Sequence, residues 1–282
     1  MSTSSAIDRS TIDTFRNEGA AVLRGVVTEH ELESLRSGID DVVARPSDCA
    51  KVASTDDDPG FFIEDFCTWR DRPAFGEFLR STRLPAIAAR LMGSERVVLY
   101  HDHVLVKEPR TRQRTPWHQD QPYYDVEGVQ NVSFWIPVDP VPIGSSLELV
   151  AGTHVGPWLM PRSFLDRQAR WFPEGSLADL PDIDARRHEF TIRSWSLEPG
   201  DAIAFHMLTV HGAPGVAGDG RRRVFSLRVL GDDMVYAPRD WVCSPDFGMV
   251  IPPGDDTRRV GESLDGEWFP ELWPHNRLVD AT

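Results

Sequence analysis

The run Val97-Val98-Leu99-Tyr100-His101-Asp102-His103-Val104-Leu105-Val106-Lys107 begins the part of the chain in which short apolar stretches alternate with Pro and Gly. Its β-branched and aromatic residues are typical of a strand. Similar runs follow at residues 132–138, 146–150, 192–197, 202–206 and 224–230. Many short strands separated by turn residues are typical of a sandwich, a jelly roll or a barrel. The sequence therefore predicts a mainly β protein.

The preceding segment, residues 1–95, is expected to be mainly helical and to flank the β region. Thr28 and Glu31 form a capping-box pattern, in which each residue satisfies an amide of the other at the start of a helix. Apolar residues then recur with a period of 3.6 residues, which predicts one buried helix face. A second helix is expected from Leu84 to Met92, because Gly93 is a suitable C-terminal cap.

Two further segments complete the expected organisation of residues 1–282 as a single domain. Residues 156–190 are expected to be an insertion into a core at residues 96–235, and residues 161–187 are rich in Trp, Phe and Pro. Long loops of this kind often supply substrate contacts, so we expect a lid near residues 161–172. Residues 236–282 are the expected C-terminal extension.

The composition argues against several classes of protein. A chain of 282 residues with 40% hydrophobic and 26% charged residues is ordinary for a globular protein. Its net charge of −14 argues against a nucleic-acid partner, because phosphates require a basic surface. The three cysteines form no CxxC pair, which argues against a disulfide framework or a zinc ribbon. The sequence has neither a secretory signal nor a run of ~20 apolar residues, so we expect a cytoplasmic protein with no membrane partner. The oligomeric state is left open.

The most informative motif is Trp117-His118-Gln119-Asp120. On a strand, His118 and Asp120 would project from the same face, because they are two residues apart. An imidazole and a carboxylate on one face supply two ligands of the two-histidine, one-carboxylate triad that binds Fe(II) in non-heme oxygenases. A bare His-x-Asp pattern also occurs in strands whose imidazole is only hydrogen-bonded. The metal-site hypothesis therefore depends on a third ligand.

The segment from Pro199 to Pro214 offers that ligand. Its Pro-Gly-Asp turn begins an apolar strand that ends at His206, and His211 follows five residues later. Unless a bulge or a turn intervenes, these two histidines point to opposite faces, so only one is expected to join the site. The residue pattern alone leaves His206 and His211 as alternatives.

Three arginines at positions 221–223 open the last apolar strand. Such a run is ordinarily a solvated edge, but an arginine that enters the interior of a barrel has to be paired with an anion. A guanidinium binds a carboxylate through two parallel hydrogen bonds, which suits the distal carboxylate of 2-oxoglutarate. The run therefore contains a candidate co-substrate anchor.

Together these motifs resemble the phytanoyl-CoA dioxygenase (PhyH) family of Fe(II)- and 2-oxoglutarate-dependent oxygenases. The matching pieces span most of the chain. They are Phe15-Arg16-Asn17-Glu18-Gly19, the helix start at Thr28, Trp117-His118-Gln119-Asp120, Val150-Ala151-Gly152-Thr153-His154, Pro199-Gly200-Asp201, Phe205-His206, His211-Gly212 and an arginine opening the last strand. The resemblance implies a double-stranded β-helix core, that is, a cupin-like jelly roll with flanking helices. It also implies Fe(II) as the metal, with 2-oxoglutarate and O2 as co-substrates.

The resemblance assigns the principal site residues. In the family, a Gly follows the distal histidine and the co-substrate arginine lies eleven residues later, and this pattern is matched by His211 and Arg222. The implied metal ligands are His118, Asp120 and His211, and the implied co-substrate anchor is Arg222. His206 is then a structural residue.

Further contacts in the same cavity are expected. Trp135 aligns with a tryptophan that lines the co-substrate pocket in the family. Lys107 and His103 alternate on the strand that precedes the metal motif, and we expect both to face the cavity. Lys107 is assigned to the co-substrate and His103 to the substrate.

The chain departs from the family pattern at two places. The family often has Ser or Thr two residues after the distal histidine, and this chain has Ala213. Thr209, Ser226 or a water is expected to replace that hydroxyl. The usual Asn-Gly before the next strand is replaced by Gly144-Ser145-Ser146. These departures affect co-substrate contacts and leave the ligands and the arginine in place.

The resemblance implies hydroxylation of an unactivated C–H bond in a small molecule, with release of succinate and CO2. Related halogenases have a small residue where this chain retains Asp120. Trp117, Tyr123 and Tyr124 flank the metal motif and are candidates for an aromatic wall against the substrate. Arg228 shares a strand face with the co-substrate arginine and is a candidate for contact with an anionic substrate.

Two alternatives come from other classes of protein. A cupin-like metalloenzyme that does not use 2-oxoglutarate would have no need of a buried arginine at position 222. A non-catalytic barrel that only binds a ligand is expected to have lost at least one metal ligand. The pattern of this chain favours the dioxygenase over both.

Overall fold

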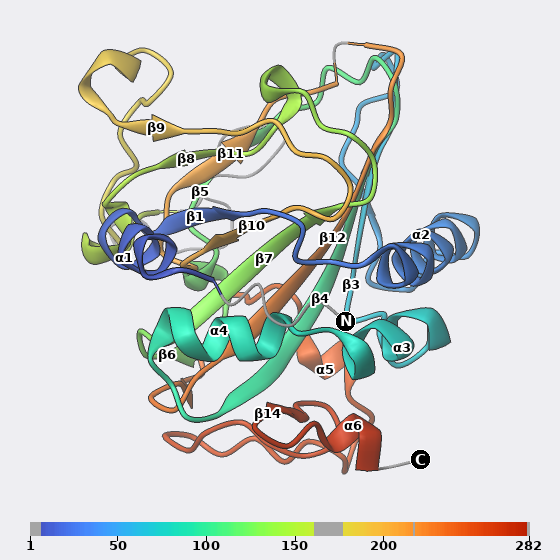
Figure 1. Ribbon diagram of the computed structural model, residues 1–282, viewed down its shortest axis with the longest axis vertical. Helices are drawn as coiled ribbons and strands as arrows, with labels where there is room; N and C mark the ends of the chain where they lie inside the picture. Colours follow the sequence, from blue (N-terminus) through green and yellow to red (C-terminus); the bar gives the residue numbers. More distant parts are fainter. Residues whose placement is uncertain (1–6, 161–176, 217, 281–282) are drawn as a thin grey trace.

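The computed structural model describes residues 7–160, 177–216 and 218–280 (Figure 1). Residues 161–176 of the expected insertion, which include the lid predicted near residues 161–172, lie outside the described residues. The protein is mainly β, with antiparallel sheets and helices that flank them. The predicted fold class is therefore confirmed.

The largest sheet has eight strands in the order β1-β10-β7-β12-β4-β3-β2, and β14 pairs with β4 outside this path. Its strands are β1 (Ala20–Leu23), β2 (Lys51–Val52), β3 (Phe62–Phe66), β4 (Val97–Lys107), β7 (Asn131–Pro137), β10 (Ala202–Phe205), β12 (Arg222–Leu230) and β14 (Glu271–Trp273). A four-stranded sheet has the order β5-β11-β8-β9. Its strands are β5 (Thr115–His118), β8 (Glu148–Val150), β9 (Ile192–Arg193) and β11 (His211–Ala213). The short strands β6 (Val126–Glu127) and β13 (Val235–Tyr236) form a third sheet.

Helices cover one face of the large sheet, and Figure 1 shows α4 (Leu84–Met92) in front of its strands. The helices are α1 (Arg9–Glu18), α2 (Glu29–Ala44), α3 (Pro73–Ser81), α4 (Leu84–Met92), α5 (Phe247–Val250) and α6 (Arg277–Asp280). Apolar side chains of α2, α3 and α4 pack with the sheet in one core. Phe225 of β12 contacts Phe75 of α3, with ring centroids 4.6 Å apart.

Alternation along β12 positions the site. Phe225 and Leu227 face the helices and belong to the core that they form with the sheet. The intervening residues, including Arg222, Ser226 and Arg228, therefore face away from the helices. They line a cavity between the large sheet and the four-stranded sheet.

Local sequence signals explain where the helices begin and end. Thr28 and Glu31 form the predicted capping box of α2, since the Thr28 side chain accepts from the Glu31 amide and the Glu31 carboxylate accepts from the Thr28 amide. Gly93 ends α4 in the left-handed region, at φ 71°, as its sequence predicts. Both helix predictions are confirmed.

The segments outside residues 96–235 contribute to the large sheet. Residues 1–95 supply β1, β2 and β3 in addition to four helices, so the description of this part as mainly helical is incomplete. The expected C-terminal extension supplies β14, which pairs with β4. The single domain over residues 1–282 and its internal boundaries remain predictions.

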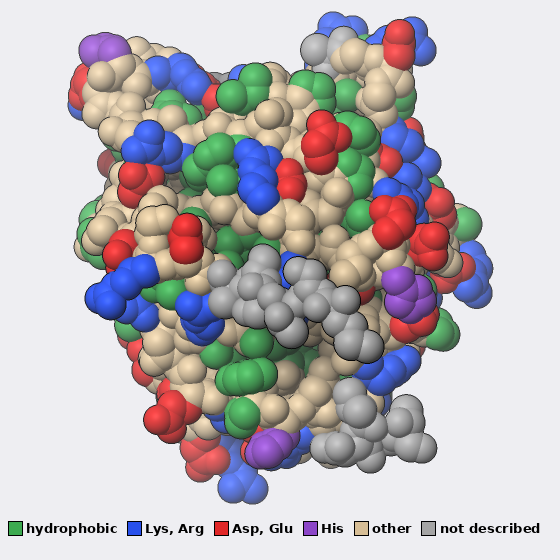
Figure 2. Space-filling view, viewed as in Figure 1, with side chains coloured by type: hydrophobic (Ala, Val, Ile, Leu, Met, Phe, Trp, Pro, Cys, Tyr) green, Lys and Arg blue, Asp and Glu red, His purple; other side chains and the backbone are tan. Residues whose placement is uncertain are grey.

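Other expectations concern the surface and the cysteines. On the face shown in Figure 2, acidic and basic side chains are interspersed and neither forms a continuous patch. Cys49, Cys67 and Cys243 are free thiols. Among the described residues, no helix has both the length and the apolar character that crossing a bilayer requires.

Candidate metal and co-substrate site

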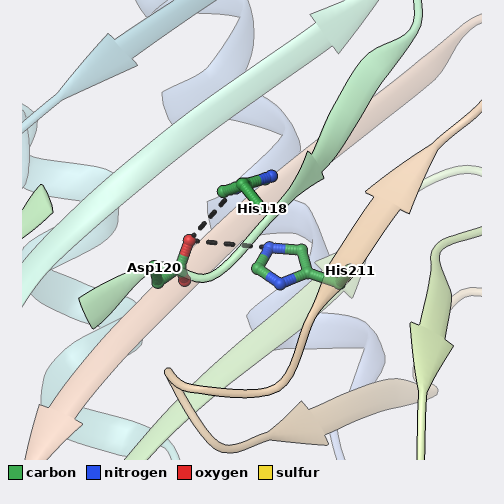
Figure 3. Close-up of side chains that lie close together, drawn as sticks. All are labelled: His118, Asp120 and His211. Atoms are coloured by element: carbon green, nitrogen blue, oxygen red, sulfur yellow. Dashed lines mark ion pairs between the residues drawn. The ribbon is translucent and has the colours of Figure 1, made fainter. Parts of the chain in front are cut away.

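The three predicted metal ligands converge (Figure 3). His118 ends β5, His211 begins β11, and the two residues are directly paired in the sheet. One carboxylate oxygen of Asp120, Oδ1, lies 3.4 Å from Nε2 of His118 and 3.5 Å from Nε2 of His211. The candidate ligand atoms all lie within 4.8 Å of one another. Residues 93 positions apart in the sequence are thus brought to one point by strand pairing.

Asp120 reaches this point in a different way from the one that its spacing suggests. Strand β5 ends at His118, and Asp120 has helical backbone angles, φ −73° and ψ −47°, at the start of the short 3₁₀ helix Gln121–Tyr123. The Asp120 amide donates to the carbonyl of Met207 at 2.8 Å. The predicted proximity is present, but it results from a turn anchored to the loop before His211, and the prediction that both residues lie on one strand was wrong.

The hydrogen bonds of the two histidines favour metal binding. Nδ1 of His118 lies 2.8 Å from the Pro116 carbonyl, and Nδ1 of His211 lies 2.9 Å from the Thr209 carbonyl. A carbonyl only accepts, so each Nδ1 carries the proton and each Nε2 presents its lone pair to the other ligands. Burial lowers the pKa of His211 to about 3, which keeps this imidazole neutral at pH 7. Two imidazole Nε2 atoms and a carboxylate are a donor set that suits Fe(II).

The second oxygen of Asp120 is held by neighbouring side chains. The Ser133 hydroxyl and Nη2 of Arg228 each donate to Oδ2 at 3.2 Å, and Nε of Arg228 donates to the Tyr124 hydroxyl at 2.5 Å. Burial opposes ionisation of Asp120, but the charge of Arg228 and the interactions with His211 and His118 together outweigh it and hold the pKa of this carboxyl well below its usual value. Arg228 therefore holds a candidate metal ligand in place, whereas the sequence predicted that it contacts an anionic substrate.

The ligands open into a cavity of about 400 Å³. Most of its wall surface is apolar, and several polar and charged side chains reach into it. The lining includes the ligands and the following residues: Lys51, Glu64, Phe66, His103, Leu105, Tyr123, Tyr124, Trp135, Phe205, Ala213, Arg222, Ser226, Arg228 and Ser244.

Arg222 has the properties of an anion site. Its side chain is buried, and Nη1 donates to the carbonyls of Ser145 and Pro214. The guanidinium lies over the Trp135 ring, 5.6 Å from its centroid. Within the described part of the chain it forms no ion pair with a carboxylate. Burial lowers the pKa of Arg222 to about 10, so the group is still a cation at neutral pH and a carboxylate would compensate its charge.

Two residues predicted to contact the co-substrate lie outside the cavity lining. Nζ of Lys107 donates to the carbonyls of Gln113 and Pro214, at 2.7 and 3.2 Å, and Lys107 does not line the cavity. The Thr209 hydroxyl donates to the Gly19 carbonyl at 2.7 Å and also lies outside the lining. Of the two hydroxyls considered as replacements at Ala213, only Ser226 lines the cavity.

Some of the predicted substrate contacts line the cavity and one does not. Tyr123, Tyr124 and His103 line the cavity. Trp117 does not, because it points to the opposite side of β5, where Nε1 donates to Asp184 at 3.1 Å and the ring packs in a separate apolar cluster. The period of two along a strand already places Trp117 on the face opposite to His118.

Several cavity residues were not identified from the sequence. Glu64 and Phe66 enter from β3, and Lys51 from β2. Phe66 stacks on His103, with ring centroids 4.0 Å apart. Burial opposes ionisation of Glu64, but the interactions with His103, Lys51 and His118 together outweigh it, so the pKa of Glu64 is lowered. The run 61–66 contains both Glu64 and Asp65, and its sequence does not show which of the two faces the cavity.

His206 lies apart from the triad. Its Nε2 contacts the Val129 carbonyl at 2.8 Å, and its Nδ1 accepts from the Leu208 amide at 3.0 Å. Both ring nitrogens are therefore used within the protein. Burial lowers the pKa of His206 to about 4, and this histidine has a structural role.

Comparison with known proteins identifies a family and a relative that match most of the chain. The family model described as phytanoyl-CoA dioxygenase (PhyH) matches residues 15–224. A probable phytanoyl-CoA dioxygenase of Caenorhabditis elegans is 23% identical over 244 residues, which is 78% of this chain and 74% of the relative.

Solved structures share the fold. The non-heme alpha ketoglutarate dependent carbocyclase SnoK from nogalamycin biosynthesis has a TM-score of 0.73 at 19% identity, over 96% of this chain and 98% of SnoK. The epimerase SnoN, solved with Fe3+, alpha ketoglutarate and nogalamycin RO, has a TM-score of 0.72 at 19% identity, over 93% of this chain and 97% of SnoN. EvdO2 from Micromonospora carbonacea var. aurantiaca, solved with 2-oxoglutarate, has a TM-score of 0.62 at 24% identity, over 86% of this chain and 99% of EvdO2.

The family match covers most of the chain and includes the stretch that carries His118, Asp120, His211 and Arg222. The resemblance inferred from the motifs is thereby confirmed. The chain belongs to the phytanoyl-CoA dioxygenase (PhyH) family and is a non-heme Fe(II)- and 2-oxoglutarate-dependent dioxygenase.

Proposed function

We propose that this enzyme hydroxylates an unactivated C–H bond of a small-molecule substrate and converts 2-oxoglutarate to succinate and CO2. The observation that carries the proposal is the Asp120 carboxylate, whose Oδ1 lies within 3.5 Å of both histidine Nε2 atoms. A carboxylate at this position occupies the place that a small residue leaves open in related halogenases. Hydroxylation is therefore the favoured reaction.

The proposed roles follow from the geometry. His118, Asp120 and His211 hold the metal, and Arg222 beside Trp135 receives the distal carboxylate of the co-substrate. When bound, iron and 2-oxoglutarate would together supply the electrons that activate O2. The protein's own contribution is to orient the co-substrate through Arg222, to fix Asp120 through Arg228, and to exclude water with the apolar cavity wall.

The proposal is tested with purified protein, Fe(II), 2-oxoglutarate and a panel of candidate small molecules under ¹⁸O2. The expected result is Fe(II)-dependent succinate release that one class of compound stimulates, with a product that carries one ¹⁸O atom. His118→Ala is expected to abolish succinate release, because it removes a metal ligand. His188→Ala, at an exposed histidine distant in sequence from the site, is the matched control and is expected to leave it unchanged.

Two results would contradict the proposal in different ways. Succinate release with products that lack added oxygen would retain the co-substrate chemistry and reject hydroxylation; such a result is relevant because the related folds include a carbocyclase and an epimerase. No binding of 2-oxoglutarate and no succinate in the presence of Fe(II) would reject the assigned site.

A further inference from the structure

Two neighbouring carboxylates of β3 have very different surroundings. Asp65 is fully buried, and its carboxylate accepts hydrogen bonds from the Ser47 amide at 2.8 Å, the Ser47 hydroxyl at 2.5 Å and the Phe66 amide at 2.8 Å. Glu64 is 5% exposed, and among the described residues its carboxylate forms one ion pair, with His103. Because they are adjacent on a strand, the two side chains point to opposite faces, and only Glu64 lines the cavity.

The contact nearest to Glu64 leaves its hydrogen-bonding capacity unused. Nε2 of His103 lies 3.4 Å from Oε2 of Glu64, yet this nitrogen has no hydrogen-bond partner in the described part of the chain. Phe66 stacks on the His103 ring and fixes its plane beside Glu64. A carboxylate has about four acceptor positions, and leaving them unsatisfied in a buried site costs free energy. A ligand that donates to Glu64 would remove this cost.

The charges around the cavity indicate which kind of donor fits. Arg228 is paired with Asp120, and Arg222 is assigned to the co-substrate. Of the charged residues that line the cavity, this leaves Glu64 and Lys51, which are directly paired between β3 and β2. This wall has no net charge, so it favours a neutral polar group over an ammonium ion. A hydroxyl donates and accepts, and therefore matches both Glu64 and the unpartnered His103 nitrogen.

We propose that Glu64 and His103 bind a hydroxyl group of a neutral, compact substrate, which the aromatic walls of the cavity enclose. The proposal rests on the proposed function in one respect, namely that the substrate occupies this cavity. Glu64 is a substrate-binding residue in this account.

Binding of three matched probes tests the proposal without turnover. Cyclohexanol donates and accepts, cyclohexanone only accepts, and cyclohexylamine is a cationic donor. Each is titrated into protein loaded with Zn(II), a redox-inert stand-in, and 2-oxoglutarate, and binding is followed by saturation-transfer NMR. We expect cyclohexanol to bind about tenfold more tightly than cyclohexanone, because the charged carboxylate prefers a donor. We also expect cyclohexylamine to bind no more tightly than cyclohexanol.

Glu64→Gln provides the decisive comparison. Its carboxamide keeps the size of the side chain and adds an N–H donor, so the preference for cyclohexanol over cyclohexanone is expected to disappear. Asp65→Asn on the opposite face is the matched control and is expected to retain the preference; if it does not fold, Glu148→Gln on β8 serves instead. Glu64→Gln is also expected to leave the unfolding midpoint unchanged or raised, whereas Asp65→Asn lowers it.

Three outcomes would overturn the proposal. They are no detectable binding of cyclohexanol, an unchanged preference in Glu64→Gln, and tighter binding of cyclohexylamine that Glu64→Gln removes, which would assign the site to an amine. Since these assays need no succinate, they are independent of a failure of the proposed hydroxylation. Failure of the hydroxylation test with an intact probe preference would leave the substrate site in place and reject only the reaction.

Discussion

Strand β12 carries two buried arginines on the same face, and they differ in what compensates their charge. Arg228 donates to the Asp120 carboxylate and to the Tyr124 hydroxyl. Arg222, six residues earlier, donates to backbone carbonyls and forms no ion pair with a described carboxylate. At a rise of about 3.3 Å per residue, the two positions are roughly 20 Å apart along the strand. They therefore serve opposite ends of one cavity.

The difference separates a structural arginine from a ligand-binding one. A buried charge that is paired inside the protein contributes to the folded state, and removing its partner is costly. A buried charge without such a partner lowers stability until a ligand compensates it. The comparison thus predicts that substitutions of Arg222 and Arg228 change stability in opposite directions.

The largest effect is expected at Arg228. Arg228→Met removes the partner of a buried carboxylate, so we expect the free energy of unfolding of the metal-free protein to fall by about 3–5 kcal/mol. Urea denaturation measures this change. Arg221→Met, at a residue that is about one third exposed and paired with Glu108, is the control and is expected to lose less than about 1 kcal/mol. Equal losses in both variants would contradict the structural role of Arg228.

Arg222→Met is expected to change the free energy of unfolding in the opposite direction. Removing a buried cation that has no carboxylate partner should raise the free energy of unfolding by about 1 kcal/mol. Addition of 2-oxoglutarate at 100 times its Kd should then stabilise the wild type by about 2.7 kcal/mol and leave the variant almost unchanged. Thermal unfolding with and without 2-oxoglutarate shows whether the wild type, less stable than Arg222→Met without the ligand, becomes the more stable protein when the ligand is added. A variant less stable than the wild type in both conditions would place Arg222 with Arg228 as a structural residue.

A smaller, pH-dependent effect extends the comparison to two histidines. Both ring nitrogens of His206 are used within the protein, whereas His211 presents Nε2 to the metal site. The folded-state pKa of His206, about 4, lies below its ordinary value of 6.5, so the unfolded chain binds the proton first as the pH falls. The contribution of His206 to stability is therefore fully present above pH 6.5 and is lost between pH 6.5 and 4. At pH 5.5 the expected loss from His206 is about 1.4 kcal/mol.

The slope of stability against pH isolates this contribution. His206→Gln is expected to be less stable than the wild type at pH 7.5, because it loses hydrogen bonds, but its stability should fall less steeply between pH 6.5 and 5. Denaturant unfolding of the metal-free proteins at several pH values gives both slopes, and the contribution of His211 cancels in the comparison. Parallel slopes would show that His206 does not titrate as described.

The sequence predicted the parts of the site that depend on fixed local patterns. The His-x-Asp motif and the family spacing predicted His118, Asp120 and His211, which lie together in the structure. The capping box of α2 was predicted from Thr28 and Glu31. Lys107 and Thr209 lie outside the cavity lining, and their polar atoms donate to carbonyls of Pro214 and Gly19, which are distant in sequence. Such partners are set by tertiary packing and leave no local signal.

Strand β3 shows why the cavity wall was missed. Its residues are buried on both faces, so the run from Phe62 to Phe66 does not alternate between apolar and polar residues. In the sequence, two adjacent carboxylates such as Glu64 and Asp65 suggest a solvent-exposed segment. In the structure, Glu64 faces the cavity and Asp65 accepts a hydrogen bond from Ser47. Sequence position alone does not distinguish the two carboxylates.

The central claim is that Arg222 receives the distal carboxylate of 2-oxoglutarate at the His118, Asp120 and His211 site. Calorimetric titration of the Zn(II)-loaded protein with 2-oxoglutarate and with 2-oxobutanoate, which lacks that carboxylate, tests it most directly. The account predicts that the wild type prefers 2-oxoglutarate by about 100-fold and that Arg222→Met shows almost no preference. An undiminished preference in Arg222→Met would contradict the claim.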